Sequence, residues 1–373
     1  MKKLIGKIHL WLSLPVGLII SILCLTGAVL VFEKDITTAL NPHLYHTDYR
    51  KGDVPLSPST LIQHIKVQMS DSLELSALEL PGTPEGVCMA SFKGAGKQTL
   101  SVNPYTGEIN GWTKSYPFFQ TMRQLHRWLM DVPPQKGAKT TGKYIVGIST
   151  LLMTFILISG LIIWIPRNRK VLKNRLTVSF TKGWRRFWYD SHVSLGIYAV
   201  AFLLIMTLTG LTWSFQWYRN MAYGLVGAST TSTPATPKDK KEKKAQATFD
   251  YKIWDTALAE VQKHYPEYAS LKLNAQTIQV NRKSNMRKTD TVHFHPQSGV
   301  LTQIIQYEDV PSSQKAKGWF YAFHTGSWGG MVSKVIYFLA ALIGGALPLS
   351  GYYLWIKKKT AHARQKHKRN ASV

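Results

Sequence analysis

Four long apolar segments interrupt an otherwise polar chain of 373 residues. They cover residues 8–32, 144–165, 192–215 and 332–356. Each is long enough to cross the hydrocarbon core of a bilayer, which takes about 20 helical residues. Because the mean hydropathy of the whole chain is only −0.10, the regions between these segments have the polarity of soluble domains. The pattern predicts a membrane α-helical protein with four transmembrane helices and two large soluble regions.

Basic residues cluster beside three ends of these segments: at Lys2, Lys3 and Lys7, in the loop 166–191 and in the tail 357–373. Lys and Arg close to a span favour the cytoplasmic side. Both termini are therefore expected in the cytoplasm, and residues 33–143 and 216–331 outside it. This topology explains much of the net charge of +26, so no nucleic-acid partner is needed, and the expected partner of the basic ends is the lipid bilayer.

Sequence features of the first half recur in the second. A histidine stands seventeen residues before the threonine of a Leu-Thr-Gly triplet in the first and third segments, and a Ser-Gly pair stands four residues before a tryptophan in the second and fourth. The features are His9 with 25–27, His192 with 208–210, 159–160 with Trp164, and 350–351 with Trp355. We interpret them as two parallel helix-module-helix repeats, related by a pseudo-twofold axis along the membrane normal.

Each soluble region has the pattern of a small α+β module. Residues 58–68 and 251–264 have helical apolar spacing, and short strands around a Pro-containing, Gly-terminated turn follow each of them. Residues 229–247, rich in Thr, Pro and Lys, are predicted to be a disordered linker within the second module.

Four histidines stand next to the apolar segments: His9 and His192 open the first and third, and His126 and His324 precede the second and fourth. Haem iron can be held by two neutral imidazoles from facing helices. The predicted symmetry axis pairs His9 with His192 near the cytoplasm and His126 with His324 outside. This predicts two haem b groups, and because two imidazoles leave no open iron position, they would act as electron carriers.

Each pair has a simpler explanation as well. His9 and His192 lie at helix starts, where an interfacial imidazole can stay hydrated. His126 and His324 stand at unequal distances from the following segments, in aromatic sequences typical of an interfacial belt.

Arginines near the four histidines are candidate partners for haem propionates, because a guanidinium group binds a carboxylate through two hydrogen bonds. They are Arg185 and Arg186 on the cytoplasmic side, and Arg123 and Arg127 outside. The positive-inside rule would account equally well for Arg185 and Arg186, and ordinary surface charge for Arg123 and Arg127.

The ordered set of motifs resembles the PepSY-associated transmembrane proteins over nearly the whole chain. The motifs are His9-Leu10-Trp11-Leu12-Ser13-Leu14 with 25–27, Leu125-His126-Arg127-Trp128-Leu129, His192 with 208–210, and 323–330. The family includes bacterial inner-membrane ferric-siderophore reductases with b-type haems and periplasmic PepSY modules. The resemblance implies that the chain reduces a ferric siderophore or another ferric chelate outside the cytoplasmic membrane, for iron acquisition.

No Gly-rich dinucleotide turn occurs in the sequence, so the electron donor is expected to be separate, either a flavoprotein or a quinol. Two other functions remain open. The modules could bind an envelope protein or peptidase while the helices merely anchor them, without redox activity. The chain could also be an accessory subunit for iron or haem uptake, although its spans carry almost none of the charges that coupled transporters use.

Overall fold

The computed structural model describes residues 1–69, 74–96, 98–135, 137–227 and 249–370. The predicted linker 229–247 lies outside these residues. The chain forms two compact units. The membrane unit comprises Met1–Glu33, Pro117–Ala222 and Phe320–Val373, and the sheet unit comprises Lys34–Tyr116 and Tyr223–Trp319.

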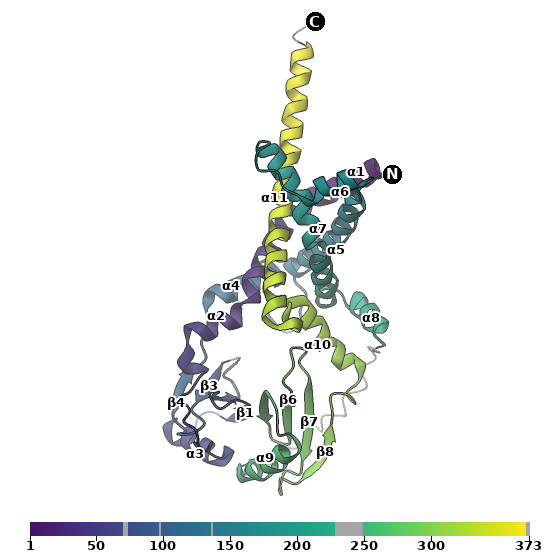
Figure 1. Ribbon diagram of the computed structural model, residues 1–373. Coiled ribbons are helices and arrows are strands. Elements are labelled where there is room, and N and C mark those ends of the chain that lie inside the picture. The colour runs from purple at the N-terminus through teal and green to yellow at the C-terminus, as the bar shows by residue number, and fades with distance from the viewer. Residues whose placement is uncertain (70–73, 97, 136, 228–248, 371–373) are drawn as a thin grey trace. The chain divides into compact units, whose positions relative to one another are not determined.

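Four helices of the described residues are long and apolar enough to cross a membrane, which confirms the predicted multi-pass membrane protein. Their spans are Lys2–Val31, Thr141–Trp164, Trp184–Trp213 and Ser327–Gln365. The helices are α1 (Lys2–Val31), α5 (Thr141–Trp164), α7 (Trp184–Gly210, continued by the 3₁₀ turn Leu211–Trp213) and α11 (Gly330–Asn370) (Figure 1). The third span begins eight residues earlier than predicted, and α11 continues through most of the basic tail.

Small residues allow the membrane helices to approach closely. A side chain at Gly344 or Gly345 of α11 would collide with Leu203 of α7 or Leu25 of α1. The Ser21 hydroxyl of α1 donates to the carbonyl of Gly345 at 2.8 Å. Such close approaches are typical of membrane interfaces, where packing replaces the hydrophobic effect. The core of the bundle contains Val16, Ile20, Met153, Leu157, Ala199, Leu203 and Ala340.

Short helices flank the spans. Helix α4 (Pro117–Trp128) precedes α5, and α10 (Ser312–Thr325) precedes the 3₁₀ turn Ser327–Gly329 and α11. Helices α6 (Arg169–Leu176) and α8 (Gln216–Leu225) lie before and after α7 in the chain, and α2 (Glu33–Leu40) and the 3₁₀ turn Pro42–Leu44 follow α1.

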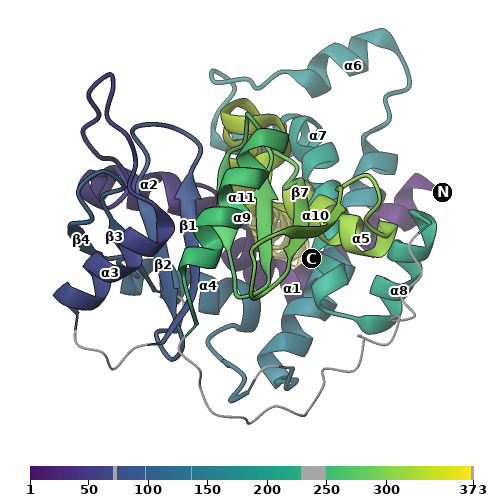
Figure 2. The same cartoon turned by 90° about the horizontal axis from the view of Figure 1, so that it is seen from below.

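The described strands of the sheet unit form one antiparallel sheet in the order β4-β3-β2-β1-β5-β6-β7-β8 (Figure 2). The strands are β1 (Leu75–Pro81), β2 (Cys88–Phe92), β3 (Thr99–Val102), β4 (Ile109–Trp112), β5 (Ser270–Leu273), β6 (Thr277–Asn281), β7 (Thr289–Phe294) and β8 (Leu301–Ile305). Strands β1 and β5 pair from Leu78 opposite Leu273 to Pro81 opposite Ser270. The two predicted modules therefore share a single sheet, which the sequence did not predict.

Two helices and the sheet enclose a single apolar core. Helices α3 (Pro58–Gln68) and α9 (Lys252–His264) confirm the predicted helical segments. Leu61 and Ile65 of α3 and Trp254 of α9 contribute to the same core as Leu78 and Leu273 of the central strands. In both halves of the unit a helix precedes four strands. A relation between these halves by a symmetry axis stays a prediction.

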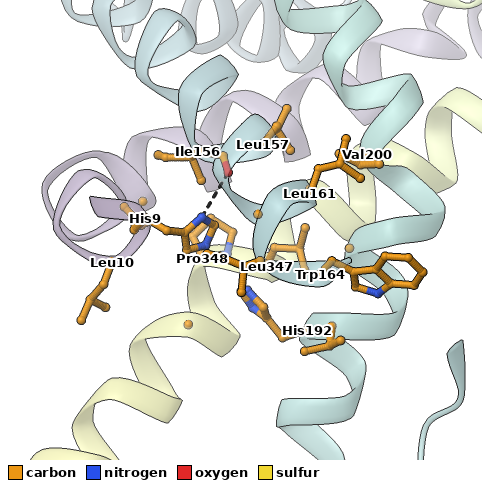
Figure 3. Close-up of a pocket in the computed structure, with 18 of the residues that line it drawn as sticks. His9, Leu10, Ile156, Leu157, Leu161, Trp164, His192, Val200, Leu347 and Pro348 are labelled. Atoms are coloured by element: carbon orange, nitrogen blue, oxygen red, sulfur yellow. Dashed lines mark hydrogen bonds between the residues drawn. The ribbon is translucent and has the colours of Figure 1, made fainter. Parts of the chain in front are cut away.

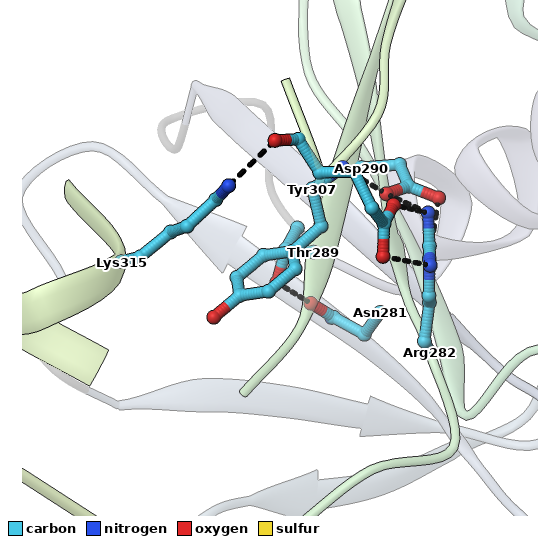
Figure 4. Close-up of polar contacts among 7 residues, drawn as sticks. Asn281, Arg282, Thr289, Asp290, Tyr307 and Lys315 are labelled. Carbon is cyan, nitrogen blue, oxygen red and sulfur yellow. Dashed lines mark hydrogen bonds and ion pairs between the residues drawn. The ribbon is translucent and has the colours of Figure 1, made fainter. Parts of the chain in front are cut away.

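A buried carboxylate fixes one edge of the sheet (Figure 4). Asp290 of β7 is fully buried. It accepts hydrogen bonds from Arg282 Nε at 2.8 Å and from the backbone N–H of Tyr307 at 2.7 Å. Arg282 also binds Glu308 through both guanidinium NH groups, at 3.0 and 2.7 Å. Asp290 thus connects β7 to the segments that follow β6 and β8.

We predict that Asp290→Ala destabilises this edge of the sheet by about 1–3 kcal/mol, because the Tyr307 N–H loses its buried acceptor. Hydrogen–deuterium exchange should accelerate in β6, β7 and β8. Glu308→Gln is the matched control: Glu308 is more than half exposed, and its contribution should stay below about 1 kcal/mol. Equal protection in both variants would contradict a structural role for the buried carboxylate.

Candidate functional site

The four histidines that flank the spans form two pairs within the membrane unit. His9 of α1 faces His192 of α7, with ring centres 6.5 Å apart. His126 of α4 faces His324 of α10, with ring centres 6.1 Å apart. We call them the first pair and the second pair. The structure therefore brings together the same partners that the sequence repeat suggested.

Each imidazole of the second pair is fixed by a threonine and a helix carbonyl. His126 Nδ1 lies 2.8 Å from the carbonyl oxygen of Leu23 and 3.3 Å from the Thr26 hydroxyl. His324 Nδ1 lies 2.9 Å from the carbonyl oxygen of Met206 and 3.2 Å from the Thr209 hydroxyl. In both cases the carbonyl belongs to the residue three positions before the threonine.

The first pair repeats this arrangement with serines. His9 Nδ1 lies 3.1 Å from the carbonyl oxygen of Ile156 and 3.0 Å from the Ser159 hydroxyl. His192 Nδ1 lies 2.8 Å from the Ser350 hydroxyl, which donates to the carbonyl of Leu347 at 2.7 Å.

These contacts determine which ring nitrogen carries the proton. A carbonyl oxygen only accepts hydrogen bonds, and each hydroxyl donates its own hydrogen to a backbone carbonyl of its helix. Nδ1 must therefore be the protonated donor in all four imidazoles. The Nε2 atoms keep their lone pairs and are available to bind a metal, because the hydrogen bond on one ring nitrogen sets the role of the other.

A glycine lies under each imidazole. A Cβ added at Gly27, Gly210 or Gly160 would lie 3.0, 3.1 or 3.3 Å from the Cε1 atom of His126, His324 or His9, respectively. At Gly351 the corresponding distance to His192 is 3.7 Å. Each glycine directly follows the threonine or serine that binds the same histidine. The Thr-Gly and Ser-Gly motifs are therefore seats for imidazole rings.

The sequence shows the Thr-Gly and Ser-Gly motifs, but it does not show which histidine each motif contacts. The Thr-Gly pairs of α1 and α7 hold the histidines of α4 and α10, whereas the Ser-Gly pairs of α5 and α11 hold those of α1 and α7. Only the repetition of a hydroxyl residue followed by glycine could have indicated this role.

The first pair opens into a cavity of about 400 Å³ in the membrane unit (Figure 3). Its walls are mainly apolar, and Figure 3 shows Leu347 and Pro348 close to the two imidazoles. The size lies within the range of cofactor pockets. Trp164 also lines the cavity, and its buried indole N–H has no hydrogen-bond partner among the described residues. A bound group with an acceptor could satisfy this donor.

Burial favours the neutral form of the second pair. Desolvation is the main cause that lowers the pKa of His126, and it lowers the pKa of His324 to about 4. The neighbouring positive charge of Lys143 acts in the same direction on both. His324 is therefore neutral at pH 7, as a metal ligand must be.

The four predicted propionate partners occupy different environments. Arg123 forms an ion pair with Glu33, and Arg127 lies with its guanidinium carbon 4.4 Å from the ring centre of Trp128. Arg186 donates to the buried Asp190 at 2.7 Å, and Arg185 is exposed.

Arg175 is the arginine that lines the cavity of the first pair. It donates to carbonyls at the end of α5, among them that of Ile163 at 2.9 Å. No sequence pattern distinguishes Arg175 from the many other basic residues of its loop.

A family model described as "PepSY-associated TM region" matches residues 7–358. The chain belongs to this family. The match includes both histidine pairs and the four Thr-Gly and Ser-Gly seats. A search of curated proteins gave no match.

We predict that Gly27→Val displaces the His126 ring, because the added side chain needs the space that the imidazole occupies. Modification of His126 by diethyl pyrocarbonate, mapped by mass spectrometry, should increase. Gly6→Val is the control in the same helix, since nothing lies within 4 Å of a Cβ there. If Gly27→Val leaves His126 as protected as in the Gly6 variant, the glycine is not its seat.

Proposed function

We propose that this membrane protein of the PepSY-associated family binds two haem b groups, one at each histidine pair, and transfers electrons across the membrane to a ferric chelate such as a ferric siderophore. The observation that carries the proposal is the fixed, paired geometry of the four imidazoles. In each pair, two rings face each other and are hydrogen-bonded through Nδ1, which leaves Nε2 available as a ligand.

The separation of the rings suits one metal between them. A metal bonds an imidazole nitrogen at about 2.0–2.1 Å, so two imidazoles on opposite sides of it have ring centres roughly 6 Å apart. The ring centres of the two pairs lie 6.5 and 6.1 Å apart, in agreement with this arrangement.

The ligand set favours haem over a bare ion. A structural zinc site usually has four protein ligands and a catalytic one three. Among the described residues, no group of three or more His, Cys, Asp or Glu side chains could hold a metal ion. The two imidazoles of a pair would hold an iron whose remaining ligands come from a porphyrin. Haem b held in this way exchanges single electrons and has no open position for oxygen.

The protein's residues would orient and shield this cofactor. The Thr-Gly and Ser-Gly seats fix the ring planes and hold the proton on Nδ1, which raises the basicity of the ligand. In the first pair, the apolar cavity walls exclude water, and Trp164 and Arg175 provide donors for the polar edge of the group. Propionate binding by Arg123, Arg185 and Arg186 is part of the proposal.

The two pairs are spaced for transfer across a bilayer. Thr26, which binds His126, follows His9 by 17 residues in α1, and this number of residues rises about 25 Å in a helix. The hydrocarbon core is about 30 Å thick. One pair would therefore lie near each face of the membrane.

The basic loop and tail indicate which histidine pair faces the cytoplasm. Arg175, from the loop 166–191, lines the cavity of the first pair, and such a basic loop favours the cytoplasm. The second pair would then lie on the periplasmic side of a bacterial inner membrane. A separate flavoprotein or quinol would supply the electrons.

The experiment is ferric-chelate reduction by proteoliposomes with a reductant enclosed inside and the chelate outside. We expect His9→Ala and His126→Ala each to lower the rate by at least about tenfold, because even the loss of a group that only hydrogen-bonds to a metal ligand commonly costs 10–100-fold, and these variants lose the ligand itself. His43→Ala, an exposed histidine of the sheet unit, should retain the rate. Unchanged reduction in both ligand variants would refute the electron-transfer function and favour an anchored binding module.

A further inference from the structure

Three cationic side chains converge beside the second pair, and we call them the three-cation cluster: Arg127 of α4, Lys143 of α5 and Arg219 of α8. The positive charges of Arg127 and Arg219 both act on Lys143. Those of Lys143 and Arg127 act on His126. The cluster therefore adjoins the place where the proposed function requires electrons to leave the protein.

Helix packing creates this convergence. The N–H of Gly142 donates to the Asp131 carboxylate at 2.8 Å, which holds the start of α5 against the end of α4. A side chain at Gly142 would collide with the carbonyl oxygen of Trp128. Farther along α5, a Cβ at Gly147 would lie 3.0 Å from Phe215, the residue before α8. Lys143 is thus placed between the helices that carry Arg127 and Arg219.

No member of the cluster forms an ion pair among the residues that the structure describes, in contrast to nearby Arg123, which pairs with Glu33. Arg219 uses Nε to donate to the Thr212 carbonyl at 2.8 Å. Arg127 lies against the Trp128 ring, and the Asp131 carboxylate accepts from Gly142.

Such an arrangement is unfavourable without a bound anion. Positive charges held close together repel one another, and an anion bound between them removes this repulsion. The positive-inside rule does not explain the cluster, because it lies at the end of the bundle opposite the basic loop that reaches the first pair. Clustered cations that face few acids attract anionic oxygen groups.

We propose that the three-cation cluster binds the anionic oxygens of the ferric chelate, so that the protein reduces carboxylate-bearing, negatively charged ferric chelates in preference to neutral ones. This inference rests on the proposed function and names its substrate class. The chelate would be held beside the second pair, and the electron that reduces Fe(III) to Fe(II) comes from the donor already proposed.

The test compares the KM for two chelates, ferric citrate as the anionic probe and a neutral ferric trihydroxamate as its counterpart. Lys143→Gln and Arg219→Gln should each raise the KM for ferric citrate by roughly three- to tenfold, as for the loss of one charge-assisted contact in a half-exposed position. The KM for the trihydroxamate and both kcat values should stay the same. Added salt should raise the citrate KM more in the wild type than in the variants.

Two further variants control for folding and for general charge. Lys139→Gln removes an exposed lysine of the α4–α5 connection and should leave both KM values unchanged. Lys143→Arg keeps the positive charge and should restore most of the citrate affinity.

Three outcomes would overturn the inference. Equal changes for both chelates would show that the cluster has no role in selecting charge. A loss of bound haem in Lys143→Gln or Arg219→Gln would assign the cluster to the carboxylates of the cofactor. Failure of the haem-loaded wild type to reduce either chelate would refute the proposed function itself, and the substrate class with it.

Discussion

The hydrogen bond from each imidazole Nδ1 to a serine or threonine hydroxyl of a membrane helix is the interaction on which the membrane unit depends. It requires the ring to lie directly against a helix backbone, and a glycine at that position makes this approach possible. It also requires a proton on Nδ1, which leaves Nε2 free. One local motif, a hydroxyl residue followed by glycine, thus sets the position, orientation and tautomer of each histidine.

This constraint connects all of the principal membrane helices. The seats for the first pair come from α5 and α11, while its histidines come from α1 and α7. The second pair takes its seats from α1 and α7 and its histidines from the short helices α4 and α10. Because α1 and α7 contribute to both pairs, a shift of either helix would disturb both ends of the bundle. Close packing at Gly344 and Gly345 limits such a shift.

The sequence predicted what depends on local pattern. Hydropathy identified the four spans, apolar spacing identified α3 and α9, and the repeat indicated which histidines pair. Features that depend on distant segments were not predictable in this way. The β1–β5 pairing joins strands almost 200 residues apart, and the three-cation cluster forms only because α4 and α8 pack near the start of α5. Arg175 is one basic residue among many until the fold places it at the cavity.

The most direct measurement for the central claim is the haem content of the purified full-length protein, determined by pyridine haemochrome and reduced-minus-oxidised spectra for the wild type and for alanine variants of the four paired histidines. The account predicts close to two haem b groups per chain in the wild type and the loss of about one in each variant. A well-folded protein that binds no haem when haem is supplied, or variants that keep the full content, would contradict it.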